Sequence, residues 1–527
     1  MTKDFSLKLL SLKRLGFLSL FAYALLLTPT FIFLWGYFCQ DAPINHTALS
    51  VDQQFSSFVN SAWRPDKFSG WSVLGVPPKS LRTILEIIKI TGIIMAGLAY
   101  VLSCKRLFCS EPDDSESEKL RMWIQRSLLW TCFILIWVIP FNSRDLYGYI
   151  DIGVLQLDYG KNPYLDVISS IPNWQTNPML HEHWADSPKP YGFLFNGLCW
   201  LLAYWAQHSF IACFLIFKTL NSLALFAASQ CFFYLARYYS LDKPLTRLFI
   251  VACNPLILLQ TVAIGHNDIL LSVLILAAFW ALTLKHNNSI TSMLFLTASL
   301  WIKYVSGVFF PGWVVLFWIQ KSWRNLFLGC GSAIALTLLL GLFPTNNFLN
   351  FYHGMTQTIG ISQFSVHSFC YRTVYYLAHW LSHWFPSLNT WIDPFASVLK
   401  QLLLAVSSAL ILWLWLGFYQ FSKTEPKPSE KMLSKKYLET GTLSLIILIM
   451  IASSVFHSWY ITLFFPLVFL IESRPRLLTF VWLLSLFHLL SFTALQNIHI
   501  LNVLLLTVVP LAWAWRRPIE RPLIENF

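Results

Sequence analysis

The sequence predicts an all-α fold, a polytopic transmembrane helical bundle of about fourteen spans with large extracytoplasmic loops that carry interfacial helices. Of the 527 residues, 56% are hydrophobic and only 12% are charged, which is more apolar side chain than the core of a soluble domain can bury. Mostly apolar runs of about 20 residues, the length that crosses a bilayer as a helix, recur along the chain. These two observations exclude a soluble globular protein.

The apolar runs predict where the spans lie. They cover approximately residues 15–38, 84–103, 124–141, 210–235, 246–264, 268–284, 288–303, 305–320, 325–343, 395–420, 440–456, 459–472, 476–495 and 499–515. The first run is too long for the apolar region of a signal peptide and has no clear small-residue cleavage site, so we expect a retained first helix.

The runs group into three expected units. Residues 1–123 form an N-terminal two-helix extension with a cytoplasmic connector, residues 124–421 form the core with an outer loop at 142–209, and residues 422–527 form a C-terminal four-helix segment.

The net charge of +12 is spread over short basic segments beside apolar runs. This is the positive-inside pattern of membrane proteins, and it makes nucleic acid an unneeded partner. Threading the runs from a cytoplasmic N-terminus places three long segments, residues 39–83, 142–209 and 344–394, on the outer side. The threading requires that residues 191–208 lie along the outer interface instead of spanning. We expect function in the outer segments, because long loops on a helical scaffold often carry the chemistry.

Asp145 is the first candidate for chemistry, because it follows an apolar run that ends at Pro140. If the segment is helical, Asp145 and Tyr149 lie one turn apart on the same face, with Arg144 beside them. A carboxylate in this position can act as a general base toward a sugar hydroxyl. The alternative interpretation is an Arg and Asp pair at a helix terminus.

Two further polar segments have open interpretations. The segment YGKNPYLD contains Asn162 and Tyr164 in a predicted tight turn, where tyrosine rings can stack on sugar. The segment GHND places His266, Asn267 and Asp268 between two apolar runs at the outer face, either as ligands or as a polar turn.

Lys218, Lys303 and Arg372 are cations in or near predicted spans. A cation in a membrane needs a counter-ion or must reach the interface, so a lipid phosphate partner competes with snorkelling or, for Arg372, with a solvated loop. The segment FHSWY adds His457 and Tyr460 at another outer turn, either as ligands or as interfacial anchors.

A metal site is a further option. His181, Glu182, His183 and Asp186 lie within six residues of the outer loop and can ligate a divalent ion if the loop curls. They lack the one-face spacing of a helical metal motif. The ten cysteines are scattered without a CxxC pair and are interpreted as packing residues. The sequence thus identifies no cofactor, and a divalent metal is left open.

Taken in order, SRDLYGYIDIG, GKNPY, PYG, NPL followed by GHND, and HSWY resemble the integral-membrane glycosyltransferases of the GT-C superfamily. The resemblance is closest to the bacterial polyprenol-phosphate-mannose-dependent alpha-(1,6)-mannosyltransferase family. It covers about Ser143 to Tyr460. One departure is PYGFLF, where the family pattern has a proline after the glycine.

The resemblance implies a polyprenyl-phosphate sugar as donor, most simply mannose, and inverting transfer to a glycan or lipid acceptor outside the cytoplasm. It also implies a bacterial inner membrane and a GT-C-like core in residues 124–421. Asp145 occupies the place of the catalytic base. The residues that the resemblance places around the pocket are Arg144, Tyr149, Asn162, Tyr164 and Tyr191, with His266, Asn267 and Asp268 opposite.

Two other functions remain open at this point. A transporter or flippase of lipid-linked sugars also combines many helices with scattered cations, although such proteins usually carry ionisable residues near the midplane and internal repeats. An O-antigen ligase or polymerase type of enzyme would depend on arginines and a histidine in a large outer loop, for which Arg372 and His367 are the nearest candidates.

Overall fold

The all-α class is confirmed by the computed structural model, in which every regular element of the described residues is helical. The described residues are 2–31, 55–56, 78–108, 114–189, 191–284, 288–343, 345–357, 366–424, 427–453, 456–492 and 504–516.

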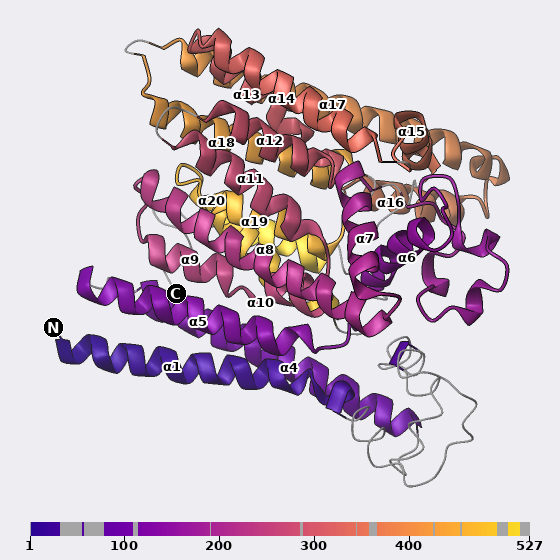
Figure 1. Ribbon diagram of the computed structural model, residues 1–527, viewed down its shortest axis with the longest axis horizontal. Helices are drawn as coiled ribbons and strands as arrows, with labels where there is room; N and C mark the ends of the chain where they lie inside the picture. Colours follow the sequence, from indigo (N-terminus) through magenta and orange to yellow (C-terminus); the bar gives the residue numbers. More distant parts are fainter. Residues whose placement is uncertain are drawn as a thin grey trace.

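The helices run in long, mostly antiparallel passes along one direction of the molecule (Figure 1). The first half of the chain contains α1 (Thr2–Leu25), α4 (Pro78–Phe108), α5 (Asp114–Ile136), α6 (Asp145–Leu157), η3 (Ile168–Ser170), η4 (Trp174–Thr176), η5 (Glu182–Trp184), α7 (Phe193–Ala206), α8 (Phe210–Tyr238), α9 (Pro244–Ala252), α10 (Pro255–Leu258) and η6 (Leu259–Ala263). The second half contains α11 (Asp268–Leu282), α12 (Ser289–Leu300), η7 (Tyr304–Phe309), α13 (Phe310–Ile319), α14 (Trp323–Gly341), α15 (Phe348–Gln357), α16 (Val366–Leu381), η8 (Pro386–Trp391), α17 (Ile392–Ser422), α18 (Glu430–Ile447), η9 (Leu448–Ala452), η10 (Ser458–Tyr460), α19 (Ile461–Val468), α20 (Pro475–Phe487), η11 (His488–Phe492), η13 (Leu504–Val508) and α22 (Val509–Arg516).

Five helical segments in the described part of the chain are long and apolar enough to cross a membrane, and six if a bent pair counts as one span. They are Lys79–Phe108, Phe210–Tyr238, Trp323–Gly341, Ser397–Ser422 and Pro475–Phe492, with Pro244–Ala252 and Pro255–Ala263 as the bent pair. Several other expected spans correspond to shorter apolar helices, among them α11, α12 and α19. These findings indicate an integral membrane protein, while the count of about fourteen spans stays a prediction.

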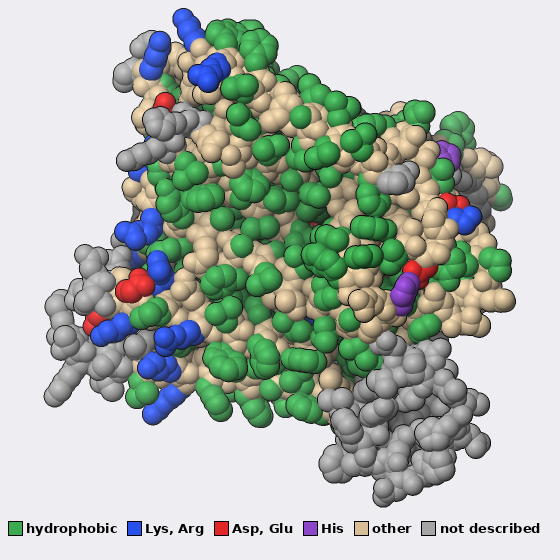
Figure 2. Space-filling model, viewed as in Figure 1, with side chains coloured by type: hydrophobic (Ala, Val, Ile, Leu, Met, Phe, Trp, Pro, Cys, Tyr) green, Lys and Arg blue, Asp and Glu red, His purple; other side chains and the backbone are tan. Residues whose placement is uncertain are grey.

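Basic side chains mark one end of the helix bundle. α4 finishes with Lys105 and Arg106, α8 finishes with Arg237, and Arg474 precedes α20. Figure 2 shows Lys and Arg side chains gathered along the left edge, on the side where Figure 1 places the N-terminus. α6, α7, α15 and α16 lie at the opposite end (Figure 1).

α7 has 14 residues, about 21 Å of helix, and belongs with α11 and α12 to the shorter apolar helices of the described chain. It packs against α6 and α8 and lies across the direction of the long helices (Figure 1). The expectation that residues 191–208 lie along the outer interface instead of spanning stays a prediction.

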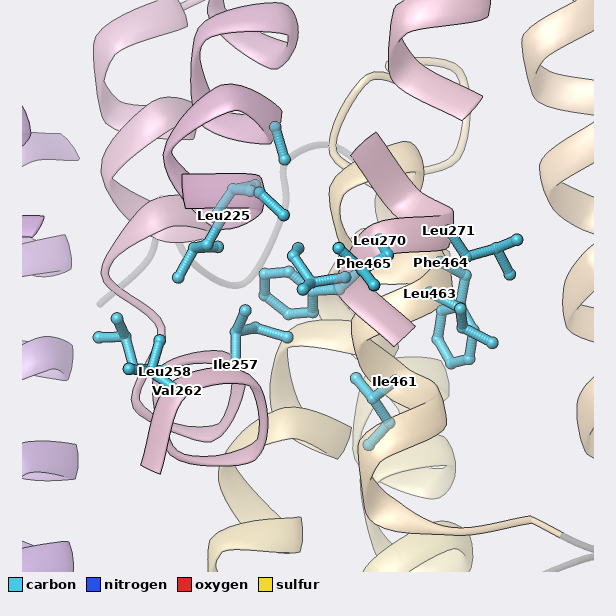
Figure 3. Packing of buried hydrophobic residues seen from close by; sticks show 14 of the residues in the cluster. Leu225, Ile257, Leu258, Val262, Leu270, Leu271, Ile461, Leu463, Phe464 and Phe465 are labelled. Atoms are coloured by element: carbon cyan, nitrogen blue, oxygen red, sulfur yellow. The ribbon is translucent and has the colours of Figure 1, made fainter. Parts of the chain in front are cut away.

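An apolar core lies between α8, α10, α11 and α19 (Figure 3). Leu225, Ile257, Leu270 and Phe464 belong to this buried core, and Figure 3 shows them between the same helices. α11 begins directly after residues 265–267, and α19 begins directly after residues 457–460. Because one core fixes both helices, the turns at their N-terminal ends are brought to one place.

A broken helix supplies one of these turns. α9 and the following α10–η6 segment are bent by 42°, and the side chain of Asn254 caps the second piece by accepting from the amides of Leu256 and Ile257. The second piece ends in the wide helical turn η6, where the amide of His266 donates to the carbonyl of Gln260 (3.0 Å). Breaks of this kind are common at functional sites of membrane proteins, where irregular backbone lies inside the protein.

Close packing of α6 on α7 generates the first prediction. A Cβ added at Gly153 of α6 would lie 2.4 Å from the carbonyl oxygen of Cys199 and 2.7 Å from the Cβ of Ala203. Small residues allow such close approach of helices in membranes. We expect Gly153→Ala to destabilise the protein by about 1–3 kcal/mol, measured as a lower midpoint of thermal unfolding in detergent. Gly197→Ala in α7 is the control, because a Cβ there meets nothing within 4 Å, and equal midpoints for the two variants would contradict the packing.

Candidate functional site

The site begins at the N-terminus of α6. Asp145 is the first residue of this helix, and its amide donates to the hydroxyl of Ser143 (3.2 Å). The N-terminal end of a helix favours an anion through its free amides and its dipole. The next residues of α6, from Leu146 to Gln156, are buried, whereas the side chain of Asp145 is 16% exposed. The carboxylate of Asp145 is therefore partly exposed, although most of α6 is buried.

The imidazole of His266 lies against this carboxylate. Its Nδ1 is 3.4 Å from Oδ2 of Asp145, a long contact, and the imidazole side chain is only 1% exposed. Two features set its position: Gly265 has φ +91° and packs on Leu146, and the side-chain amide of Asn221 on α8 donates to the carbonyl of His266 (3.2 Å). A side chain other than glycine is strained at this φ, so the turn requires Gly265.

Three aromatic rings form a continuous stack beside Asp145. The indole of Trp459 stacks on His266 with centroids 4.0 Å apart, and on His457 at 4.1 Å. Ser458, which lies between His457 and Trp459 in the sequence, accepts a hydrogen bond from the side-chain amide of Gln260 (2.8 Å). The stack therefore joins the 457–460 segment to the turn before α11.

A buried ion pair joins Asp268, which follows the same turn, to Lys303. Nζ of Lys303 is 2.6 Å from Oδ1 of Asp268, whose side chain is 1% exposed. The ammonium of Lys303 also lies over the ring of Tyr460, 4.7 Å from its centroid, in a cation–π contact. Lys303 remains 16% exposed. The ammonium of Lys303 and the carboxylate of Asp145 are therefore both partly accessible, whereas their partners, Asp268 and His266, are buried.

Asn267 connects the turn to α6. The phenol of Tyr149 donates to Oδ1 of Asn267 (3.3 Å), and the ring of Tyr149 packs edge-on against Tyr191, with centroids 5.4 Å apart. Four buried atoms of the turn have no hydrogen-bond partner among the described residues: Nδ1 and Nε2 of His266, Nδ2 of Asn267 and Oδ2 of Asp268. Native structures contain few such atoms, and a group of them is typical of a functional site.

The surroundings of Asp145 keep it ionised. Burial by itself raises the pKa of a carboxyl, but the contact and charge of His266, with the charges of His457 and Lys303, outweigh burial and lower the pKa of Asp145 to about 2. Burial lowers the pKa of His457 to about 4, with the charges of His266 and Lys303 adding to the effect and that of Asp145 opposing it. At neutral pH the site therefore combines an anionic Asp145 with a neutral His457.

Not every candidate from the sequence lies at this site. Arg144 precedes Asp145 at the N-cap of α6 and is partly buried. Asn162 holds a turn, since it accepts from the amide of Tyr164 (3.0 Å) and donates to the carbonyl of Thr345 (3.1 Å). Tyr164 packs with Phe193 and Trp301 in a separate aromatic cluster.

The other two cations lie elsewhere. Lys218 is fully buried in α8, where its ammonium donates to the carbonyl of Val138 and lies 4.8 Å from the ring centroid of Phe214. Arg372 belongs to α16, and its side chain, like that of His367, lies outside the described part of the chain.

The residues considered as metal ligands do not come together in the described structure. His181 turns inward to Asp151, with 3.1 Å between Nδ1 and Oδ1, whereas Glu182 and Asp186 are exposed and the side chain of His183 is not described. Within the described ranges no group of three or more His, Cys, Asp or Glu residues is arranged to hold a metal. Nearby, burial lowers the pKa of Lys189 to about 8, against the charges of Asp151 and Asp145.

Sequence reasoning did not find Asn221, Gln260 and the Asp151–His181 pair. The partners of these contacts are separated by 40 residues (Asn221–Thr261), 198 residues (Gln260–Ser458) and 30 residues (Asp151–His181), so no local motif reveals them. Trp459 was visible in the HSWY segment, but its place between two imidazoles was not. A polar residue within an apolar run, such as Asn221 in α8, was the one available signal.

Comparison with known proteins identifies one family. The model of the alpha-(1->6)-mannopyranosyltransferase N-terminal domain matches residues 54–320, just over half of the chain. The match includes Asp145, the turn at 265–268 and Lys303, whereas the segment 457–460 follows it. Searches of curated proteins and of solved structures find no match.

The buried ion pair generates a stability prediction. Lys303→Met leaves the carboxylate of Asp268 buried without its cation, so we expect a loss of about 3–5 kcal/mol in unfolding free energy. The double variant Lys303→Met/Asp268→Asn removes both charges and should recover a large part of that loss. Thermal unfolding in detergent measures the single variants Lys303→Met and Asp268→Asn and the double variant. A loss of unfolding free energy in the double variant equal to the sum of the two single losses would show that the pair contributes no coupling.

The lowered pKa of His457 generates a pH prediction. A histidine whose pKa is lower in the folded protein than in the unfolded chain is protonated first in the unfolded chain, so acid favours unfolding. We expect stability to fall as the pH drops from about 6.5, the usual histidine value, to about 4. His457→Gln should make this fall shallower, as followed by unfolding midpoints at several pH values. An unchanged slope would refute the assignment to His457.

Proposed function

Since this chain belongs to the alpha-(1->6)-mannopyranosyltransferase family, and is thereby indicated as a mannosyltransferase, we propose that it takes mannose from a polyprenyl-phosphate donor. The acceptor is a glycan or a lipid, and transfer occurs with inversion at the anomeric carbon. The observation that carries the proposal is that one polar cluster contains an accessible carboxylate, Asp145, held by the buried His266, and an accessible cation, Lys303, held by the buried Asp268.

Asp145 acts as the general base. It removes the proton of the acceptor hydroxyl while the acceptor oxygen forms a bond to the anomeric carbon. The bond from that carbon to the phosphate oxygen breaks on the opposite face, and its electron pair stays on the phosphate. The transition state resembles that of an inverting glycosidase, with the acceptor hydroxyl in place of water.

Lys303 is the cation that binds the leaving phosphate. Its ammonium is fixed by Asp268 and by the ring of Tyr460, so it needs no rearrangement to stabilise the developing anion. Lys218 and Arg372 remain candidates for the lipid phosphate, although the ammonium of Lys218 is fully buried against a backbone carbonyl.

Donor binding also tunes the base. Without donor, the contact with His266 and the charges of His266, His457 and Lys303 keep the pKa of Asp145 at about 2, which ensures ionisation but makes the carboxylate a weak base. A phosphate anion beside Lys303 offsets that positive charge, so the carboxylate gains basicity when the donor is in place. Efficient proton transfer requires a base whose pKa lies nearer the working pH.

The geometry of the bundle supports an extracytoplasmic site. Basic residues gather at one end of the helices (Figure 2), which the positive-inside rule places in the cytoplasm. α5 begins at Asp114, beyond the cytoplasmic end of α4, and runs toward the opposite end, after which the chain reaches Asp145. We propose a GT-C type of protein of about fourteen spans in a bacterial inner membrane, with the lipid tail of the donor entering between helices.

The position of the charges favours transfer over transport. Transporters hold ionisable residues near the midplane on discontinuous helices, whereas Asp145, His266, Asp268 and Lys303 gather at the helix ends opposite the basic edge. Of the two other functions considered, a flippase would be favoured if no transfer occurs with any lipid-linked sugar.

The test is transfer of labelled mannose from a synthetic polyprenyl-phosphate-mannose by purified protein in nanodiscs. We expect Asp145→Asn to lower the turnover by about 10²–10⁴-fold, the usual contribution of a general base, with an unfolding midpoint close to that of the wild type. Asp242→Asn is the matched control, because Asp242 is exposed in the loop between α8 and α9 and should keep full activity. Full transfer by a folded Asp145→Asn variant would exclude the assigned base.

A further inference from the structure

A hollow of about 580 Å³ lies at the far end of α6, away from Asp145. Its lining residues come from the C-terminal ends of α6 and α7 and from the residues that follow them. They are Leu157, Asp158, Tyr204, Trp205, Gln207 and His208. Ligand pockets of proteins commonly have this size, and the catalytic scheme above uses none of these residues.

Two exposed aromatic rings from successive residues of α7 line the hollow, and we call them the platform. Trp205 is 60% exposed and Tyr204 is 56% exposed, and no other ring of the described residues stacks on Trp205. Tyr204 is itself supported from below by Trp200, which stacks on it with centroids 5.7 Å apart and planes at 12°. An exposed ring held by a second ring is a rigid surface, with little conformational entropy to lose when a ligand covers it.

A polar pair stands beside the platform. Nδ1 of His208 is 3.1 Å from Oδ1 of Asp158, with the histidine 67% and the carboxylate 17% exposed. Gln207 and His208 both have positive φ, 48° and 64°, a conformation that costs free energy for residues other than glycine. The hollow thus contains the imidazole of His208, the carboxylate of Asp158 and the amide of Gln207 together with the two rings. α7 also ends there, at Ala206.

The hollow and Asp145 are held at a fixed separation by α6. This helix has 13 residues, so its two ends lie about 18 Å apart. Most of the helix is buried and packs along α7, which makes the separation rigid. A chain of several linked sugar rings spans a distance of this order, whereas one sugar does not.

We propose that this hollow is a binding subsite for the distal sugars of a neutral oligosaccharide acceptor. The inference rests on the proposed function and deepens it, because it assigns the acceptor to the class of glycan chains. Aromatic platforms bind the CH faces of pyranose rings, and the carboxylate, amide and imidazole bind their hydroxyls. The lining contains Asp158 and no Lys or Arg, so it disfavours an anionic lipid headgroup, for which basic residues would be needed.

The experiment compares acceptors of different length. Purified full-length protein in nanodiscs receives polyprenyl-phosphate-mannose with either methyl α-mannoside or an α-(1→6)-linked mannopentaose as acceptor, and KM and kcat are measured for each. The variants are Trp205→Ala and Asp158→Asn. Trp384→Ala serves as the matched control, because this tryptophan, which follows α16, is 75% exposed and lies outside the hollow.

We expect Trp205→Ala to raise the KM of the pentaose about tenfold, the usual effect of truncating an aromatic anchor, with kcat unchanged. The KM of methyl mannoside should stay constant, and Trp384→Ala should change neither value. Asp158→Asn should raise the KM of the pentaose by a smaller factor and leave the unfolding midpoint unchanged. An interfacial role of Trp205 alone predicts equal KM values for wild type and variant on both acceptors, and that result would overturn the subsite.

Failure of the subsite can be told apart from failure of the proposed function. If the wild type transfers mannose to both acceptors but its variants show no length dependence, only the subsite is wrong. If the wild type transfers mannose to no acceptor, the proposed function itself is wrong. Binding of mannopentaose without donor, measured by quenching of tryptophan fluorescence in wild type and Trp205→Ala, gives an independent readout, and equal affinities would also overturn the subsite.

Discussion

The contact between the carboxylate of Asp145 and the imidazole of His266 is the interaction on which the candidate site depends. It joins the first residue of α6 to the turn before α11, and through the stack on Trp459 it reaches the segment before α19. An ionised carboxylate inside an apolar bundle is costly unless charges or hydrogen bonds compensate it. The contact with His266 and the charge of Lys303 supply that compensation at neutral pH. Asp145 and Lys303 each remain 16% exposed, and the proposed transfer places the donor between them.

The apolar core makes this contact possible at little entropic cost. α11 packs on both α8 and α19, around Leu225, Leu270 and Phe464 (Figure 3). Two turns that are almost 200 residues apart in the chain therefore start from fixed helices. Their polar side chains meet without long flexible loops, so the site is preorganised. The wide turn η6 follows α10, and beyond it the carbonyl of His266 accepts a hydrogen bond from the side chain of Asn221.

The sequence predicted the all-α membrane fold and the family because both depend on local features. Apolar runs, basic loops and the motifs SRD and GHND are visible without any tertiary contact. It also named Asp145, His266, Asp268 and Lys303 as candidates. It could not show that Lys303 pairs with Asp268, that Trp459 lies between two histidines, or that Asn162 and Tyr164 belong to a separate turn and cluster. Those relations depend on packing between distant segments, which periodicity and spacing do not encode.

The central claim is that the donor phosphate and the sugar are held between Lys303 and Asp145. A cryo-electron microscopy structure of the protein in nanodiscs with a non-transferable polyprenyl-phosphate-mannose analogue tests it most directly. The account predicts the phosphate within ion-pair distance of the ammonium of Lys303 and the sugar between it and the carboxylate of Asp145. A donor bound at the basic edge of the bundle, or at the midplane away from Asp145, would contradict it.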